Sequence, residues 1–137
     1  MSFSEVRIEN SGPRGQVKTG IKSFEDLIAW QRARELTLLI YEYTKQYPPE
    51  ERYGLSPQMR RSTISVTSNI AEGFGRQQSK DKEHYYVMAL GSLSELQSQI
   101  IISSDLGYMN SEQLKTARAK LTETRRLLSA LLNAHRK

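Results

Sequence analysis

Apolar residues recur at intervals of three and four along most of this chain, a spacing typical of helices with one buried face. The pattern predicts helices over residues 24–47, 57–74, 80–106 and 111–135. No segment of the sequence alternates with the two-residue period of a strand. Because the links between the helices are short, we expect an all-α fold, an antiparallel up-down-up-down four-helix bundle.

Three of the predicted helices begin at residues that favour helix N-termini. Ser23 is followed by Asp26 at the spacing of a capping box, and Asn110 is followed by a glutamine at the same spacing. Ser56 is predicted to cap the second helix, with Pro57 at its first helical position. These residues place the helix starts independently of the apolar pattern.

Proline and glycine mark the predicted ends of three helices. The pair Pro48 and Pro49 must end the first helix, because proline has no backbone N–H and disfavours a helical residue before it. Gly73 or Gly75 is expected to stop the second helix, and Gly107 is expected to stop the third.

The chain of 137 residues is long enough for one domain with one core. Residues 1–22 lack periodicity and are predicted to be a flexible arm, or in part the remnant of a tag, ahead of a bundle domain over 23–137. The absence of cysteine excludes disulfides and thiolate metal sites. With no signal peptide and no long apolar run, the sequence predicts a soluble cytoplasmic protein that does not contact a membrane.

Two of the predicted helices carry more apolar surface than one bundle needs. On the helix over 80–106, Val87, Leu90 and Ile101 form a second seam beside the main stripe. On the helix over 57–74, Ile64 and Ala71 widen the apolar face. These side chains either widen the core or meet another subunit. Large exposed apolar patches are uncommon on monomers, so we predict a homo-oligomer.

The helix over 57–74 also has a narrow polar face with two interpretations. It is either a polar seam between helices or subunits, or a ligand site. An arginine at the start of this helix, Arg60 or Arg61, is expected to pair with Glu95 of the next helix or of another subunit. The residues predicted to line the subunit interface are Ile64, Ser65, Asn69, Ala71, Glu72, Val87, Leu90, Glu95 and Ile101.

The net charge of +5 is concentrated at the C-terminal end. Residues 111–137 hold seven basic and two acidic side chains. The basic ones gather on one face of the last helix, which is either a solvated face or a surface for phosphate backbones. The face has no aromatic side chain, so binding by shape and charge is expected. The residues predicted to contact nucleic acid are Lys115, Arg118, Arg125 and Arg126, with Arg60, Arg61 and Arg76 at the ends of the second helix.

Several motifs in order resemble a family of small bacterial four-helix-bundle proteins, the intervening-sequence proteins encoded by inserts in 23S rRNA genes. Residues 1–22 extend beyond the usual start, and Thr67 stands where members often carry proline. The motifs that carry the resemblance are SFEDLIAWQRA (23–33), QMRRS (58–62), SNIAEGFGR (68–76), GSLSEL (91–96) and LGY (106–108).

The resemblance implies a ring-like homopentamer. The sequence also looks like the accessory subunit of diversity-generating retroelements, which works with a reverse transcriptase and nucleic acid. The family has no established catalytic residues, so none can be transferred to this chain. The resemblance agrees with the surplus apolar seams and leaves the biochemical role open.

The sequence contains little that indicates an enzyme, a cofactor or a metal site. Asp81 and His84 have the spacing of a di-iron half-site, but the second half-site is missing. The segment from Gly73 to Gly75 follows a helix rather than a strand, so it is not a phosphate-binding loop. Serines are plentiful, but none stands in a nucleophile motif. We therefore predict a protein that is not an enzyme.

The sequence leaves two main hypotheses. The first is a homo-oligomeric bundle that binds structured RNA or DNA, or a nucleic-acid enzyme such as a reverse transcriptase, through repeated basic faces. The second is an interaction scaffold whose basic face meets an acidic protein, with no direct contact to nucleic acid. A third possibility is a small-molecule site on the polar face formed by Arg61, Asn69 and Glu72.

Overall fold

The computed structural model describes residues 20–136, and this part of the chain contains helices and no strands. Residues 1–19 of the predicted arm lie outside the described residues, and so does Lys137. The prediction of an all-α fold with four helices is confirmed. The elements are η2 (Phe24–Asp26), α2 (Ile28–Thr44), η3 (Pro49–Glu51), α3 (Leu55–Gly75), α4 (Ser79–Asp105) and α5 (Ser111–Ala134).

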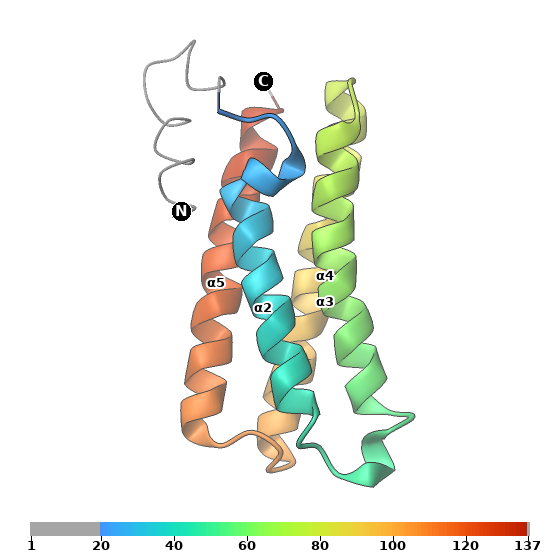
Figure 1. Ribbon diagram of the computed structural model, residues 1–137, viewed down its shortest axis with the longest axis vertical. Coiled ribbons are helices and arrows are strands. Elements are labelled where there is room, and N and C mark those ends of the chain that lie inside the picture. The colour runs from blue at the N-terminus through green and yellow to red at the C-terminus, as the bar shows by residue number, and fades with distance from the viewer. Residues whose placement is uncertain (1–19, 137) are drawn as a thin grey trace.

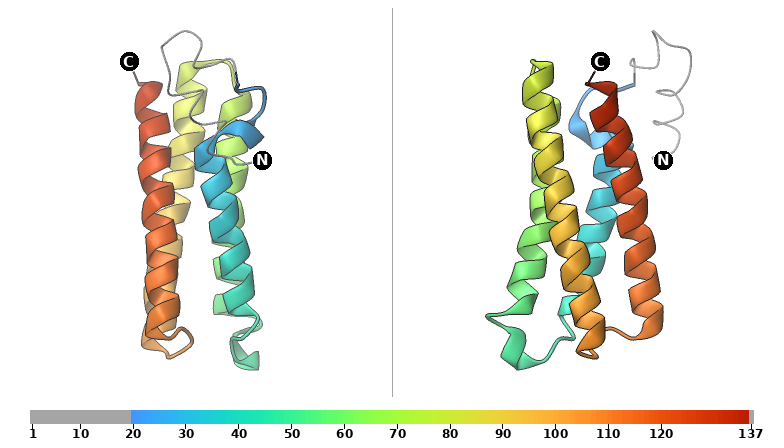
Figure 2. Two further views of the ribbon diagram at one scale, coloured as in Figure 1. Left: turned by 60° about the vertical axis from the view of Figure 1, so that its left-hand side comes forward. Right: turned by 180° about the vertical axis from the view of Figure 1, so that it is seen from behind.

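The four α-helices lie side by side along one long axis (Figure 1). The chain runs down α2, back along α3, down α4 and back along α5, with a short link at each turn (Figures 1 and 2). Helix α3 contacts α2 and α4, and α5 contacts α4 and α2. Helices α3 and α5 therefore occupy opposite corners of the bundle. The most extensive contact joins α3 and α4.

Two of the helical segments, η2 and α5, begin with capping boxes at the residues that the sequence indicates. The Ser23 hydroxyl accepts the Glu25 backbone N–H at 3.1 Å, but it caps the short turn η2 rather than α2. The predicted helix over 24–47 was therefore wrong at its start, since α2 begins at Ile28. At α5, Asn110 Oδ1 accepts the Gln113 N–H at 2.8 Å, and the Gln113 side chain returns the bond at 2.9 Å.

The prediction that Ser56 caps the second helix was wrong. Helix α3 begins at Leu55, two residues before the predicted start, and its first N–H donates to Glu51 Oε1 at 2.8 Å. A carboxylate from the preceding turn η3 thus replaces the serine cap. Pro57 falls at the third helical position, where a missing N–H is harmless because the first N–H groups of a helix have no backbone partner.

Helix α2 ends at Thr44, three residues before the predicted end of its helix. The N–H groups of Gln46 and Tyr47 bond three residues back instead of four, which tightens the chain ahead of Pro48. Proline disfavours a helical residue before it, so the chain leaves the helix early. Tyr47 nevertheless remains buried in the core.

The glycines of α3 and α4 have different roles. Gly75 is the last residue of α3, as the sequence allows, and Gly107 follows α4 with a φ of 83°, in the left-handed region that favours glycine. Gly73 lies inside α3, where a Cβ would come within 2.6 Å of the Tyr86 ring of α4. This glycine permits the close approach of α3 and α4.

One core runs between the four helices, and the spacing in the sequence predicts its members. A hydrogen bond of 2.9 Å between the buried hydroxyls of Thr37 and Thr63 joins α2 to α3 within it. No helix in the described part of the chain has the length and apolar character needed to cross a membrane. The largest fully buried side chains are Tyr86, Leu36, Ile40, Met59, Ile70, Leu93, Leu96, Ile100 and Leu128.

Candidate nucleic-acid interface

Three basic side chains of helix α5 are exposed and take no part in the ion pairs of the described residues. One face of the helix packs into the core through residues spaced three and four apart, such as Ala117 and Leu121. Lys115, Arg118 and Arg126 lie on the remaining surface and are exposed. Within residues 20–136 none of these three forms an ion pair. Their charge is therefore available to an anionic partner.

Arg125, the fourth basic residue predicted for this surface, is held against α4. Its guanidinium donates to Gln97 Oε1 at 2.7 Å and to Ser94 Oγ at 3.3 Å, and the side chain is half-buried. Arg118 lines a small cavity of about 30 Å³ with the same glutamine. Arg118 and Arg125 therefore border α4, while Lys115 and Arg126 lie farther around α5.

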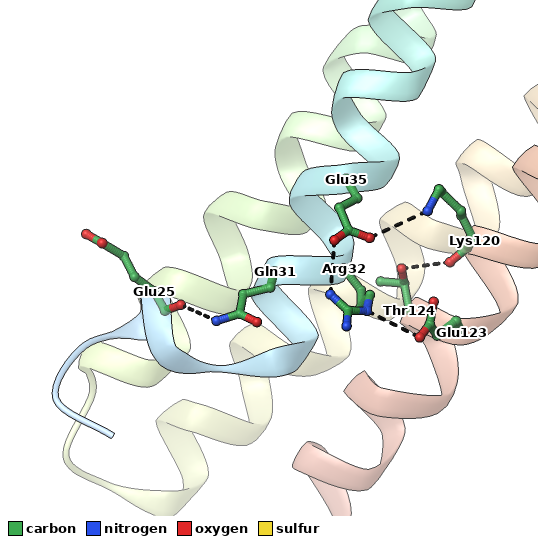
Figure 3. Close-up of polar contacts among 7 residues, drawn as sticks. All are labelled: Glu25, Gln31, Arg32, Glu35, Lys120, Glu123 and Thr124. Carbon is green, nitrogen blue, oxygen red and sulfur yellow. Dashed lines mark hydrogen bonds and ion pairs between the residues drawn. The ribbon is translucent and has the colours of Figure 1, made fainter. Parts of the chain in front are cut away.

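The other flank of α5 is neutralised by charges on α2, as Figure 3 shows. Lys120 Nζ lies 3.5 Å from Glu35 Oε1, and the other oxygen of that carboxylate accepts from Arg32 at 3.0 Å. Arg32 also bonds Glu123 at 3.3 Å. This ladder of four alternating charges joins α2 to α5, and the sequence analysis did not predict it. It leaves the unpaired cations on the solvent face and on the flank next to α4.

Two of the predicted cations of α3 have other neighbours. The Arg60 guanidinium stacks on the Tyr41 ring with 4.6 Å between its carbon and the ring centroid, and its Nε donates to Thr44 Oγ1 at 2.9 Å. Arg60 is thereby fixed between α2 and α3. Arg61 is exposed and donates to Gln58, one turn earlier on the same helix, at 3.3 Å.

Arg76, just after α3, is also engaged. It donates to Glu72 at 2.6 Å and to the Tyr85 hydroxyl at 2.8 Å, and it stacks on that ring at 4.8 Å. Because α3 and α5 occupy opposite corners, these arginines do not extend the basic surface of α5. The predicted nucleic-acid residues thus lie on two separate surfaces of one chain.

The apolar residues predicted for a subunit interface are partly uncovered. Ile64 and Val87 are each 43% exposed and Ile101 is 37% exposed, whereas Ala71 and Leu90 are half-buried. A bundle of one chain therefore leaves a run of aliphatic side chains on the outside of α4. The pattern in the sequence missed three further exposed apolar residues, which are Met88 and Ile102 of α4 and Leu106 just after its end.

The polar face of α3 forms a short seam rather than one continuous site. Asn69 Nδ2 donates to the Ser65 carbonyl at 2.9 Å, and the Ser92 hydroxyl of α4 donates to Ser65 Oγ at 2.8 Å. Glu72 is exposed and pairs with an arginine one turn on. Glu95 is exposed, and it forms no ion pair with Arg60 or Arg61 among residues 20–136.

Of the sequence motifs considered for chemistry, the carboxylate–histidine pair lies on the surface, whereas Gly73 is buried inside α3. Asp81 and His84 are exposed in the first turns of α4, and residues 20–136 contain no group of three metal-binding side chains. Burial raises the pKa of Tyr86 to about 12, which makes its phenol harder to deprotonate than that of a free tyrosine, itself protonated at neutral pH. A protonated phenol in the core offers neither a base nor a nucleophile.

Comparison with known families identifies the chain. Residues 25–130 match the family described as 23S rRNA-intervening sequence protein. The chain belongs to this family. The match begins in η2 and ends in α5 at residue 130, so it covers α2, α3, α4 and all but the last four residues of α5. The resemblance drawn from the sequence motifs is confirmed.

A solved structure supports the fold of this intervening-sequence protein. It is a protein of unknown function from the S23 ribosomal protein family of Bacteroides thetaiotaomicron, with 21% sequence identity and a TM-score of 0.68. The alignment covers 76% of the present chain and 97% of that protein. At this identity the similarity establishes the fold alone. No curated protein sequence matches the chain.

Proposed function

We propose that this protein is a non-enzymatic, homo-oligomeric bundle of the cytoplasm that binds structured RNA or DNA through the basic face of α5. The observation that carries the proposal is the exposure of Lys115, Arg118 and Arg126 with no ion pair among the described residues. The family is described by an rRNA intervening sequence, and on that association we choose nucleic acid as the anionic partner.

The chemistry of this face suits a phosphate backbone. Each cation that neutralises a phosphate releases condensed counterions, which favours binding without regard to base sequence. Helix α5 contains no aromatic residue on which an unpaired base could stack. Recognition through shape and charge, as with a folded RNA or a duplex, therefore fits better than recognition of single-stranded sequence.

Assembly into a ring would strengthen this binding. The exposed Val87 and Ile101 of α4 give each antiparallel bundle an apolar surface that a second copy can cover. We place five copies in the ring because of the resemblance to pentameric bundles. Repeating the α5 face around a ring makes the second and later contacts intramolecular, which raises the overall affinity.

The test is binding of an RNA hairpin and a DNA duplex, measured by fluorescence anisotropy over a series of salt concentrations. We expect affinity to fall steeply with salt. The double substitution Arg118→Gln, Arg126→Gln should weaken binding and reduce the salt slope by about 2 for each subunit that contacts the nucleic acid. The matched control is Arg34→Gln, Lys80→Gln, which removes two exposed cations from α2 and α4.

Two outcomes would contradict the proposal. One is the absence of binding at low salt, and the other is an equal loss of affinity in the control variant. If nuclease-treated material retains an acidic protein and untreated material yields no nucleic acid, the protein is an interaction scaffold instead. Folding of each variant is checked by its helical circular dichroism.

A further inference from the structure

A pocket at the connection between α2 and α3 is lined by three cations. It has a volume of about 410 Å³ and includes Lys45, Arg52 and Arg60. Among the described residues that line it, none is acidic. No residue of α5 takes part, so the pocket is separate from the proposed nucleic-acid face and does not depend on that proposal.

The three cations differ in how firmly they are held. Arg60 is fixed at the wall of the pocket by Thr44 and Tyr41. Its Nε donates to Thr44 Oγ1, its Nη2 donates to the Tyr41 carbonyl at 3.4 Å, and one face of the guanidinium stacks on the Tyr41 ring, which leaves Nη1 without a partner among the described residues. Lys45 and Arg52 are exposed, and neither forms an ion pair within residues 20–136. One oriented guanidinium and two adaptable cations therefore share one pocket.

Neither Glu50 nor Glu51 of η3 lines the pocket, and neither forms an ion pair within residues 20–136. Glu51 uses Oε1 to accept the Leu55 N–H at 2.8 Å and Oε2 to accept the Tyr108 hydroxyl at 2.8 Å, and it does not line the pocket. Its bond to Leu55 satisfies the first N–H of α3. The next N–H, that of Ser56, lies in the first helical turn and has no helical partner, and Ser56 lines the pocket.

The rest of the lining is stiff. Pro48, Pro49 and Pro57 form part of the wall with the buried Tyr47. Proline fixes its own φ angle, so this connection has few conformations to lose when a ligand binds. A preformed pocket avoids much of the ordering cost of binding.

We propose that this pocket binds the phosphate group of a phosphorylated ligand. A phosphate monoester has three acceptor oxygens and a charge of about −1.5 to −2 at neutral pH, which matches three cations and a serine better than one carboxylate does. Arg60 offers its fixed guanidinium to one edge of the phosphate. Lys45 and Arg52 close on the remaining oxygens, and Ser56 donates its N–H or hydroxyl.

The experiment is calorimetric titration of the full chain with inorganic phosphate at constant ionic strength, with acetate as the comparison anion. We expect phosphate to bind and acetate not to bind. Arg52→Gln and Lys45→Gln each remove one charged contact and are expected to weaken phosphate binding roughly tenfold. The control variant Arg34→Gln, which removes an exposed arginine elsewhere on α2, should bind phosphate as tightly as the parent does.

No binding of phosphate, or equal affinity for acetate, overturns the proposal. So does an unchanged affinity in both pocket variants, or an equal loss in Arg34→Gln. A final comparison identifies the source of the phosphate, using an RNA hairpin with and without a 5′-phosphate. Preference for the phosphorylated hairpin that disappears in Arg52→Gln supports a nucleic-acid end in the pocket. Phosphate binding without that preference supports a small phosphorylated compound.

Discussion

The α3–α4 pair and helix α5 bury similar inner faces but present opposite outer ones. Helices α3 and α4 approach closely at Gly73 and leave aliphatic side chains such as Val87 and Ile101 uncovered. Helix α5 packs through leucine and alanine and exposes unpaired cations such as Arg126. The inner face of a helix thus sets the fold, while its outer face is free to serve a separate purpose. In this bundle, apolar and basic surfaces lie on different helices.

The largest expected effect is loss of assembly when the apolar exterior of α4 is charged. In the double variant Val87→Lys, Ile101→Lys, lysines replace side chains that are 43% and 37% exposed in one chain, so the bundle itself should fold. If a second copy covers this face, burying the new charges is costly and the oligomer dissociates to monomers. Sedimentation velocity measures the mass.

The control for assembly is Leu38→Lys, at a residue on α2 that is 60% exposed. It should leave the native mass unchanged. An oligomer that survives the double substitution on α4 would show that the apolar exterior of this helix is not the subunit interface. The contrast between the α4 and α5 surfaces would then have no bearing on assembly.

The next effect concerns the close approach of α3 and α4. Gly73→Ala places a methyl group 2.6 Å from Tyr86 Cε1. The group in its way is a rigid, buried ring, so the substitution forces the ring or the helices to shift. We expect a loss of about 2 kcal/mol in the free energy of unfolding, measured by urea denaturation. Gly91→Ala in α4, where a Cβ meets nothing within 4 Å, should instead add up to about 1 kcal/mol. Equal effects would contradict the close contact.

A smaller effect on stability distinguishes Arg125, which is hydrogen-bonded to α4, from the exposed cations of α5. Arg125→Gln removes the guanidinium that bonds Gln97 and Ser94, and should lower the free energy of unfolding by about 1 kcal/mol. Arg126→Gln removes an exposed charge and should change stability by less than about 0.5 kcal/mol while it weakens nucleic-acid binding. The reverse order of stability would show that the α4 contact contributes nothing.

The smallest effect is the pH dependence of the Glu51 cap. Its hydrogen bond from the Leu55 N–H, followed by that from Tyr108, lowers the pKa of this carboxyl. A lowered pKa in the folded state means that the stabilisation is complete above the unfolded pKa of about 4.3 and is lost as pH falls through the folded value. The Tm difference between the parent and Glu51→Gln should therefore shrink in acid. Glu50→Gln, an exposed neighbour, should show no such trend.

The sequence predicted the fold wherever a local pattern determines the structure. Apolar spacing predicted the burial of residues such as Leu93 and Leu128, and Asn110 marked the start of α5. The cap of α3 was misplaced because Glu51 acts from outside the helix. In the candidate site, the exposure of Arg126 followed from its place on the helix, whereas the tether of Arg125 depends on where α4 packs. The pattern of residues along one chain does not give the distance between the Arg125 guanidinium and Gln97 of α4, which the packing of the two helices sets.

The charge ladder between α2 and α5 also bears on how the chain folds. Arg32 and Glu123 are 91 positions apart, so their contact closes a far longer loop than any contact between consecutive helices. The entropic cost of closing a loop rises with loop length, so the charge ladder is expected to form after the contacts between consecutive helices. Glu35, Lys120 and Glu123 are partly exposed, so salt screens the attraction within the ladder. The rate at which the first and last helices dock should therefore slow as ionic strength rises.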